Sequence, residues 1–407
     1  MAVKTKKSLE ELVRSRFNDL NLLIEDLNNE DNNPFHKVYQ AYDSGKVEAD
    51  QKPKIIAGSY SYLGMGDHPR VTQAVLEAIK QFGTTSHGSR VLTGSTQIHH
   101  DLEKTIASFI GGESAITFPT GWITNFSTIS SLFGPNDTII TDLKNHNSIH
   151  AGTEASGAKT IFFNAEKPST LERALKKAGD TVTLVIIDSV FSMDGVIAPL
   201  PEILDLCKKY NAFIMIDEAH SIGVLGNKGK GITEYFGIDP MEIDILMGNT
   251  NKAIAGSGGY IVARKEITEF LRYRANGYLF SNAIPAHLIA ASVESIKVIQ
   301  DHPEIIADLR EKHTYFRNKI IDSGFDPIGD NTPIIPIIYP DELSVIETAK
   351  GFWNKGIFVV PAIHPAVSKK TPRIRFCINV GHSYEDLDYI VESLIEISEN
   401  SVIDLRT

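Results

Sequence analysis

A lysine and an aspartate that could act on one bound molecule lie in the middle of the chain, each after an apolar run. Asp217 follows the run at 212–216, and His220 comes shortly after it. Lys252 lies in the glycine-rich stretch at 247–260. A carboxylate at the end of a strand can pair with a protonated ring nitrogen, and a lysine of lowered pKa can form a Schiff base. These residues therefore indicate Schiff-base chemistry beside a protonated ring.

Each of these residues also has a simpler structural interpretation. Asp217 could cap the helix that follows it, and Lys252 could be an exposed lysine in a turn. Residues 217–220 also spell DEAH, the metal-binding box of helicases. That box needs a phosphate loop of the form G-x-x-x-x-G-K-[ST], which this sequence lacks. Asp217 and Lys252 are about one strand–helix–strand unit apart, and this spacing favours a shared site.

Two further strand ends carry polar groups. Gly121 and Trp122 open an expected helix, whose backbone amides would form an anion site. His146 follows the apolar run at 138–141 and could stack on a planar ring, although a lone histidine is more often structural. His150 suggests a metal pair with His146, but no third ligand has suitable spacing, so we expect no metal.

Short apolar runs alternate with helical periods from about residue 54 onward. This alternation predicts an α/β fold with a mostly parallel sheet and helices on both faces. The runs that we expect to be strands of this sheet are 114–118, 138–141, 160–163, 183–187, 212–216, 241–247 and 259–263.

The pattern divides the chain into three regions. Residues 1–53 are predicted to be an N-terminal helical arm, because the apolar positions between Ser8 and Leu27 have helical spacing. Residues 54–285 are expected to form the large domain. Residues 286–407 are expected to form a smaller α+β domain, with helices at 286–301, 304–323 and 384–397 and apolar runs at 332–338 and 373–378.

Composition excludes several classes of protein. The chain of 407 residues has a net charge of −11, so a nucleic-acid partner is not expected. Cys207 and Cys377 are expected to be free thiols. No run approaches the roughly 20 apolar residues that span a bilayer, and we expect a cytoplasmic protein without an integral membrane segment.

Five stretches together resemble the α-oxoamine synthases, which are fold-type I enzymes that use pyridoxal 5′-phosphate (PLP). This family includes 8-amino-7-oxononanoate synthase, 2-amino-3-ketobutyrate CoA ligase, 5-aminolevulinate synthase and serine palmitoyltransferase, and cysteate acyltransferases of sulfonolipid synthesis look similar. The resemblance runs from about residue 55 to 397. Its stretches are YLGMGDHP at 62–69, HGSRVLTGSTQIHHDLE at 87–103, DSVFSMDGVIAPL at 188–200, DEAHSIGVLGNKGKG at 217–231 and RIRFCINVGHSYED at 373–386.

The resemblance implies a role for each site residue. Lys252 would hold PLP as a Schiff base and act as acid and base, and Asp217 would pair with the ring nitrogen. His146 would stack on the ring. The other implied contacts are His220 and Ser192 near the phenolic oxygen, Gly121, Trp122, Asn249 and Asn251 around the phosphate and Lys252, Ser281 at the phosphate of a neighbouring subunit, and Arg375 and Ser61 at the amino-acid substrate.

The implied reaction joins an acyl thioester to a small amino acid, with loss of CO2, and gives an α-aminoketone. Serine or an analogue such as cysteate is the expected acceptor, with glycine or alanine next. A shared site implies a homodimer, and the thioester could be carried by CoA or by an acyl carrier protein. An aminotransferase or aldolase of the same fold, and an inactive regulatory subunit, remain alternatives.

The sequence departs from the family pattern in three places. Asn249 and Asn251 stand where the family usually has threonine and serine, and Ser61 replaces an asparagine. The loop at 361–367 reads PAIHPAV, without the arginine that serine palmitoyltransferases often carry there. These changes concern the choice of amino acid, and they favour an unusual member of the family.

Overall fold

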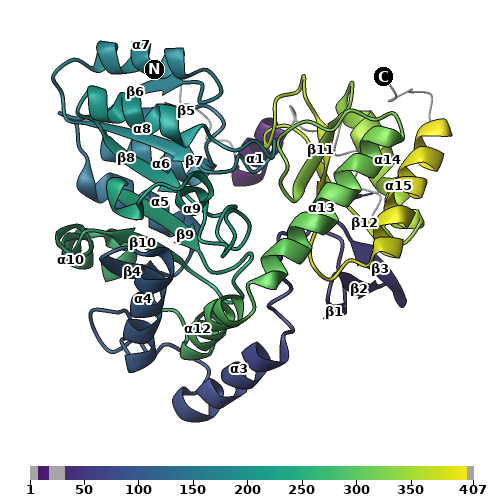
Figure 1. Cartoon of the computed structure of the whole chain (residues 1–407), viewed down its shortest axis with the longest axis horizontal. Coiled ribbons are helices and arrows are strands. Elements are labelled where there is room, and N and C mark those ends of the chain that lie inside the picture. Colours follow the sequence, from purple (N-terminus) through teal and green to yellow (C-terminus); the bar gives the residue numbers. More distant parts are fainter. Residues whose placement is uncertain (1–7, 18–32, 401–407) are drawn as a thin grey trace.

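A seven-stranded sheet forms the centre of the large domain in the computed structural model, which describes residues 8–17 and 33–400 (Figure 1). Strand β10 runs antiparallel to both of its neighbours, and the other adjacent pairs are parallel. The strands in spatial order are β4 (Ser114–Phe118), β10 (Gly259–Ala263), β9 (Ile245–Asn249), β8 (Phe213–Asp217), β7 (Thr183–Asp188), β5 (Thr138–Asp142) and β6 (Lys159–Phe163).

Helices cover both faces of this sheet, which confirms the predicted α/β fold. Successive side chains of a strand point to opposite faces, so each strand contributes to two cores. Val185 and Ile187 join one core, while Leu184 and Ile186 join the other. The first core is closed by α4 (Gln97–Ile110), α7 (Pro168–Ala178), α8 (Leu200–Lys209) and α12 (Ala286–Asp301), and the second by α5 (Gly121–Leu132), α6 (Asn147–Ser156), α10 (Lys265–Arg274) and α11 (Asn276–Leu279).

The smaller C-terminal body has its own sheet and core, as expected (Figure 1). Its antiparallel strands are β11 (Ile334–Ile338), β14 (Arg373–Cys377) and β13 (Val360–Ala362). They pack with α13 (Glu304–Asp322), α14 (Glu342–Asn354) and α15 (Tyr384–Glu399). Across residues 8–17 and 33–400, no helix is both long enough and apolar enough to cross a membrane.

Strands occupy part of the region predicted to be a helical arm. Helix α1 (Leu9–Phe17) covers the start of the expected helix, whose remainder lies outside the described residues. The chain then forms the meander β1 (Ala41–Asp43), β2 (Lys46–Ala49) and β3 (Lys52–Ile56). Both of its two-residue turns have positive φ at each position, at 44–45 and 50–51, which is the hairpin geometry that suits strand twist. The prediction of a helical arm is therefore wrong from residue 41 onward.

The meander is joined to the C-terminal body. Strand β3 pairs in parallel with β12 (Ile357–Phe358), which completes a four-stranded sheet. Beyond β3, the N–H of Cys377 donates to the carbonyl of Ala57 at 2.7 Å, and the N–H of Val380 donates to that of Tyr62 at 3.0 Å. The segment 57–62 is thereby held against β14 and the residues that follow it.

The change from one core to the other falls inside α13. Helix α12 packs against α3 (Pro69–Phe82) and α4, and Ile306 and Leu309 of α13 belong to the same large core. Phe316, further along α13, belongs to the C-terminal core. The packing of α13 therefore favours a boundary between the two domains later than residue 286. The three predicted domain ranges stay a proposal.

The expected strand at 241–247 begins later than predicted. Pro240–Glu242 form a short 3-10 helix, whose first N–H groups are capped by Asp239. The proline lacks an N–H for a sheet, and the Asp–Pro pair favours a turn. Strand β9 therefore starts at Ile245 and ends at Asn249.

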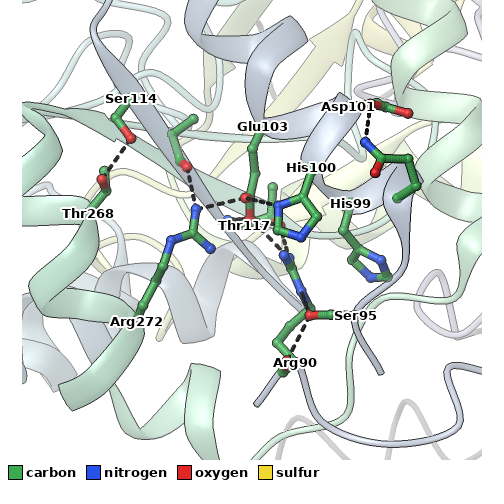
Figure 2. A network of polar contacts seen from close by, with 12 residues as sticks. Arg90, Ser95, His99, His100, Asp101, Glu103, Ser114, Thr117, Thr268 and Arg272 are labelled. Carbon is green, nitrogen blue, oxygen red and sulfur yellow. Dashed lines mark hydrogen bonds and ion pairs between the residues drawn. The ribbon is translucent and has the colours of Figure 1, made fainter. Parts of the chain in front are cut away.

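A buried carboxylate joins α4, β4 and α10 (Figure 2). Glu103 Oε1 accepts from Arg90 Nη1 at 3.0 Å and from the N–H of Thr117 at 3.2 Å, and its Oε2 accepts from Arg272 Nη2 at 2.7 Å. Burial alone would raise the pKa of Glu103, but the two arginines outweigh it and the pKa is lowered. The charged network thus fixes β4 just before the chain enters the α5 turn.

Replacing this carboxylate by an amide should destabilise the fold. Glu103→Gln leaves two arginines without their counter-charge, and we expect the free energy of unfolding at pH 7 to fall by about 3 kcal/mol. The lowered pKa means that the stabilisation exists above the unfolded value and is lost on acidification through the folded value. The difference in the free energy of unfolding between wild type and variant should therefore disappear at low pH in urea titrations.

The exposed Glu113 supplies the control, since Glu113→Gln should leave the free energy of unfolding nearly unchanged. A loss below about 0.5 kcal/mol for Glu103→Gln would match an exposed ion pair and contradict the network.

Candidate active site

A cavity of about 400 Å³ lies where the parallel strands end. The carboxyl ends of parallel strands meet at one edge of a sheet, and loops from several strands therefore converge there. Arg375 enters from β14 of the smaller body. The predicted site residues that line the cavity are Gly121, Trp122, His146, Ser192, Asp217, His220, Asn249, Asn251, Lys252 and Arg375.

Lys252 presents its amine to the cavity from the loop after β9. Its Nζ lies 2.8 Å from Nε2 of His220. Burial lowers the pKa of Lys252 to about 8, although Asp217 and Asp188 act in the opposite direction. A substantial share of the amine is therefore unprotonated, and nucleophilic, slightly above neutral pH.

The carboxylate of Asp217 ends β8 and is held by two donors. Asn125 Nδ2 donates to Oδ2 at 2.7 Å, and the N–H of Ala219 donates to Oδ1 at 2.9 Å. Asn125 also donates to Oγ of Ser148 at 2.9 Å, which links α5 to α6 behind the cavity. The carboxylate is thus fixed in a position where a cationic ring nitrogen could pair with it.

A second carboxyl group lies beside Asp217. Asp188 ends β7 in direct register with Asp217 at the end of β8, so the two residues lie side by side at one edge of the sheet. Asp188 Oδ2 accepts from the N–H of His146 at 3.2 Å, while its Oδ1 has no partner within residues 8–17 and 33–400. Burial, and then the charge of Asp217, hold the pKa of Asp188 well above its usual range. The raised pKa favours the protonated form of Asp188 beside Asp217.

Both histidines of the cavity are neutral near pH 7. Burial and the nearby ammonium of Lys252 lower the pKa of His220, and burial lowers that of His146 against the pull of Asp217. His146 caps α6, with Nδ1 at 2.7 Å from Oγ of Ser148. Its predicted stacking role suits a neutral ring, and it stays a prediction.

The first turn of α5 forms an anion cradle. Thr120 caps the helix and uses its Oγ1 to accept from the N–H of Ile123, which leaves the N–H groups of Gly121 and Trp122 for a ligand. Gly259 of β10 permits the close approach, because a Cβ there would lie 2.8 Å from Cα of Gly121.

Two predicted residues lie outside the cavity lining. Ser61 is adjacent to Tyr60, which lines the cavity, and Ser281 lies in the partly exposed loop before α12. Their proposed contacts with substrate and with a neighbouring subunit stay predictions. In the described part of the chain, no three His, Cys, Asp or Glu side chains are placed to hold a metal ion.

Sequence reasoning missed several contributors. Tyr60, Asn125, Ser148 and Asp188 all line the cavity, and Tyr62 lies against His220. Asp188 could have been identified, because it ends an apolar run as Asp217 does. Nothing in the sequence marks Asn125, which lies inside a helix and meets Asp217 only in the fold.

These groups together fit PLP. The amine of Lys252 suits an aldehyde, the fixed carboxylate of Asp217 suits a ring nitrogen, and the α5 amides suit a phosphate. Asn249 points an amide next to Gly121, and its Oδ1 is buried without a partner among the described residues. The cavity thus offers matching groups for each polar part of one molecule.

The state of Lys252 can be tested in the cofactor-free protein. Labelling by a small aldehyde with cyanoborohydride needs the neutral amine, so its rate at Lys252 should rise with pH around a midpoint of about 8. Asp217→Asn removes a charge that raises the pKa, and the midpoint should move lower. Peptide mass spectrometry measures the labelling of Lys252 in the wild type and in Asp217→Asn, and so gives both midpoints.

The exposed Lys104 provides an internal reference, because its labelling should be the same in both proteins. A Lys252 midpoint near 10.5, the value of an ordinary lysine, would contradict the buried site.

Known proteins resemble this chain over almost its whole length. Residues 52–394 match the aminotransferase class I and II family. The 8-amino-7-oxononanoate synthase of Thermoanaerobacter pseudethanolicus is 36% identical over 352 residues, 86% of this chain and 89% of that protein. The serine palmitoyltransferase of Bacteroides thetaiotaomicron is 35% identical over 364 residues, 89% of this chain and 92% of that protein.

Comparison with solved structures points to the same kind of enzyme. A solved structure of SPT with PLP superposes with a TM-score of 0.91 at 27% identity, covering 97% of this chain and 99% of that one. The predicted fold type, cofactor and enzyme class are thereby confirmed. The chain belongs to the aminotransferase class I and II family and, within it, to the α-oxoamine synthases, which are PLP-dependent acyltransferases.

Proposed function

We propose that this enzyme condenses a long-chain acyl thioester with serine, or with a close analogue such as cysteate, and releases CO2 to form an α-aminoketone. Such a product would serve sphingolipid or sulfonolipid synthesis. The observation that carries the proposal is the convergence of Lys252, Asp217 and Arg375 on one cavity. The likeness in fold to SPT, over 97% of this chain, supports serine over glycine or alanine.

Different residues have different roles in this reaction. PLP, when bound, withdraws electrons from the α-carbon of the attached amino acid. Asp217 keeps a proton on the ring nitrogen, and Asn125 and Ala219 hold Asp217 in place. Lys252, with its pKa lowered to about 8, can take the α-proton near neutral pH and return it later.

Arg375 is the cation that remains for the substrate carboxylate. One of its nitrogens, Nη1, donates to the carbonyl of Ser192 at 3.0 Å, which aims the guanidinium at the cavity. The nearby carboxylate of Asp194 is already paired with Arg373 and with Lys144. Among the described residues, no carboxylate pairs with the planar guanidinium of Arg375. This guanidinium therefore suits a bidentate contact with the carboxylate of an amino acid.

Arg375→Lys should therefore weaken amino-acid binding. We expect KM for the amino acid to rise about 10–100-fold while kcat falls less, since a lysine cannot make the bidentate contact. Steady-state kinetics with a saturating thioester measure both constants.

The exposed Arg264 gives a matched control, and Arg264→Lys should change neither constant. An unchanged KM in Arg375→Lys would remove Arg375 from the substrate site.

The acceptor is identified by an amino-acid panel. Release of free thiol from palmitoyl-CoA is followed with serine, cysteate, glycine and alanine, and then with the same acyl group on an acyl carrier protein. We expect thiol release with serine or cysteate, lost in Lys252→Ala. Release with glycine or alanine alone would favour the corresponding C-acyltransferase. Turnover of ketoacids without thiol release would indicate an aminotransferase, and no turnover with any of them would indicate a regulatory subunit.

We also propose that the enzyme acts as a homodimer. Leu92 and Phe280 are 79% and 83% exposed, and their loops lie together, because the N–H of Ala283 donates to the carbonyl of Gly88 at 2.9 Å. Paired exposed apolar side chains are typical of an interaction surface. Ser281 lies next to Phe280, so a second subunit on this surface would meet the residue expected at its phosphate.

Phe280→Asp should weaken this dimer, since a charge would be buried in the apolar contact. Light scattering after gel filtration should give twice the chain mass for the wild type and a lower mass for the variant, with weaker retention of PLP.

Leu343→Asp, at a 58% exposed position of α14, should leave the mass unchanged. A wild type that elutes with the mass of one chain would contradict the homodimer.

A further inference from the structure

Two side chains behind the cavity connect the carboxylate of Asp217 to the ring of His146. Asn125 Nδ2 donates to Oδ2 of Asp217 at 2.7 Å and to Oγ of Ser148 at 2.9 Å. The same Oγ lies 2.7 Å from Nδ1 of His146. Asn125 and Ser148 are 1% and 0% exposed, so the middle of this chain is shielded from solvent. Asp217, Asn125, Ser148 and His146 therefore form one chain of hydrogen bonds.

The chain has a fixed direction. A carboxylate only accepts hydrogen bonds, so Asn125 must turn its NH2 group, and not its carbonyl, toward Asp217. The second hydrogen of that NH2 group goes to Oγ of Ser148, which accepts it. The hydroxyl hydrogen of Ser148 remains for Nδ1 of His146, and the backbone N–H of Ser148 also donates to this nitrogen, at 3.3 Å. Since a backbone N–H can only donate, Nδ1 carries no proton.

Asn125 makes its two contacts at a cost. Its carbonyl atom, Oδ1, is buried and has no partner within residues 8–17 and 33–400. An unpaired buried acceptor is unfavourable, and a well-packed apolar side chain would avoid it. Two N–H donors at one point explain the asparagine, because neither an aspartate nor a leucine of similar size could supply them.

We propose that Asn125 and Ser148 are positioning residues that hold His146 as a neutral ring with its proton on Nε2. In this form the ring can donate a hydrogen bond from Nε2 to a bound molecule. It can gain a proton only at Nδ1, where two donors already point. His146 is thereby excluded as the base, and Lys252 keeps that role. This assignment of the base rests on the proposed function, whereas the position of the ring proton does not.

The chain is compatible with a bound cofactor. Stacking, as predicted for His146, uses the face of the imidazole, while Nδ1 lies at the edge of the ring and contacts Ser148. The two oxygens of the Asp217 carboxylate offer about four acceptor positions, and Asn125 and the N–H of Ala219 take one each. Acceptor positions on Asp217 thus remain for the ring nitrogen of PLP.

Other charges near His146 act on its ring but do not replace this chain. Burial lowers the pKa of His146, against the pull of Asp217. Within the described residues, Nδ1 of His146 has hydrogen bonds to Ser148 alone. The groups that face the ring or backbone of His146 from the packed elements are Asp217 of β8, Lys252 after β9, His150 of α6 and Asp188 of β7.

The experiment follows His146 by 15N-histidine spectra of the full-length enzyme with PLP bound. The signal is assigned by its loss in His146→Gln. In the wild type we expect the Nε2–H tautomer at about pH 8, where the ring is neutral. In Ser148→Ala, Nδ1 loses one of its two donors and accepts a proton more readily. The pH midpoint at which His146 becomes charged should therefore rise by about 0.7 units.

Two further variants separate this role from simple packing. Asn125→Ala frees the hydroxyl of Ser148 to turn, and it should raise the midpoint of His146 by a smaller amount. Ser156→Ala removes another buried hydroxyl of α6, whose contacts are with Thr153 and Ala158, and should leave the midpoint unchanged. Circular dichroism and the absorbance of bound PLP confirm that each variant keeps its fold and its cofactor.

A proton on Nδ1 of neutral His146 in the wild type would overturn the inference. So would an unchanged midpoint in Ser148→Ala or in Asn125→Ala, because the backbone N–H alone would then fix the ring. A failed amino-acid panel would leave these readouts intact, so the two proposals fail separately.

Discussion

Burial of the Lys252 amine beside two carboxyl groups is the interaction on which the rest of the site depends. Burial makes the ammonium costly, and Asp217 and Asp188 offset part of that cost, so the pKa settles near 8. Asp188 and Asp217 end neighbouring strands in direct register, and burial, followed by the charge of Asp217, raises the pKa of Asp188. The amine is therefore available near neutral pH, and among the described residues no ion pair joins it to either acid.

The fold supplies this arrangement from two bodies. The parallel sheet brings Asp188, Asp217 and Lys252 to one edge, and the α5 amides lie beside them. Arg375 comes from the C-terminal sheet, while Tyr62 is bonded through its carbonyl to Val380 and packs its side chain in the large core. The residues proposed to hold the cofactor and the arginine proposed for the substrate thus lie on different bodies, and both line one cavity.

The sequence predicted the parts whose signal is local. Apolar runs identified the strands of the large sheet, and polar residues at their ends identified Lys252, Asp217, His220 and His146. Contacts between distant residues gave no such signal: Asn125 lies 92 residues from Asp217, and Tyr62 lies 158 from His220. The hairpins at 44–45 and 50–51 were missed because backbone geometry at ordinary turn residues, Ser-Gly and Asp-Gln, decides them.

The pairing of β3 with β12 has a consequence for synthesis of the chain on the ribosome. Lys54 at this junction donates to the carbonyl of Trp353, 299 residues later. At ~5–20 residues per second, β3 waits on the order of 15–60 s for its neighbour, with one edge unpaired. Tyr62 can reach its place only after that delay. The nascent chain must therefore protect an early strand until its last quarter emerges, and this is the stage at which chaperones would have most to do.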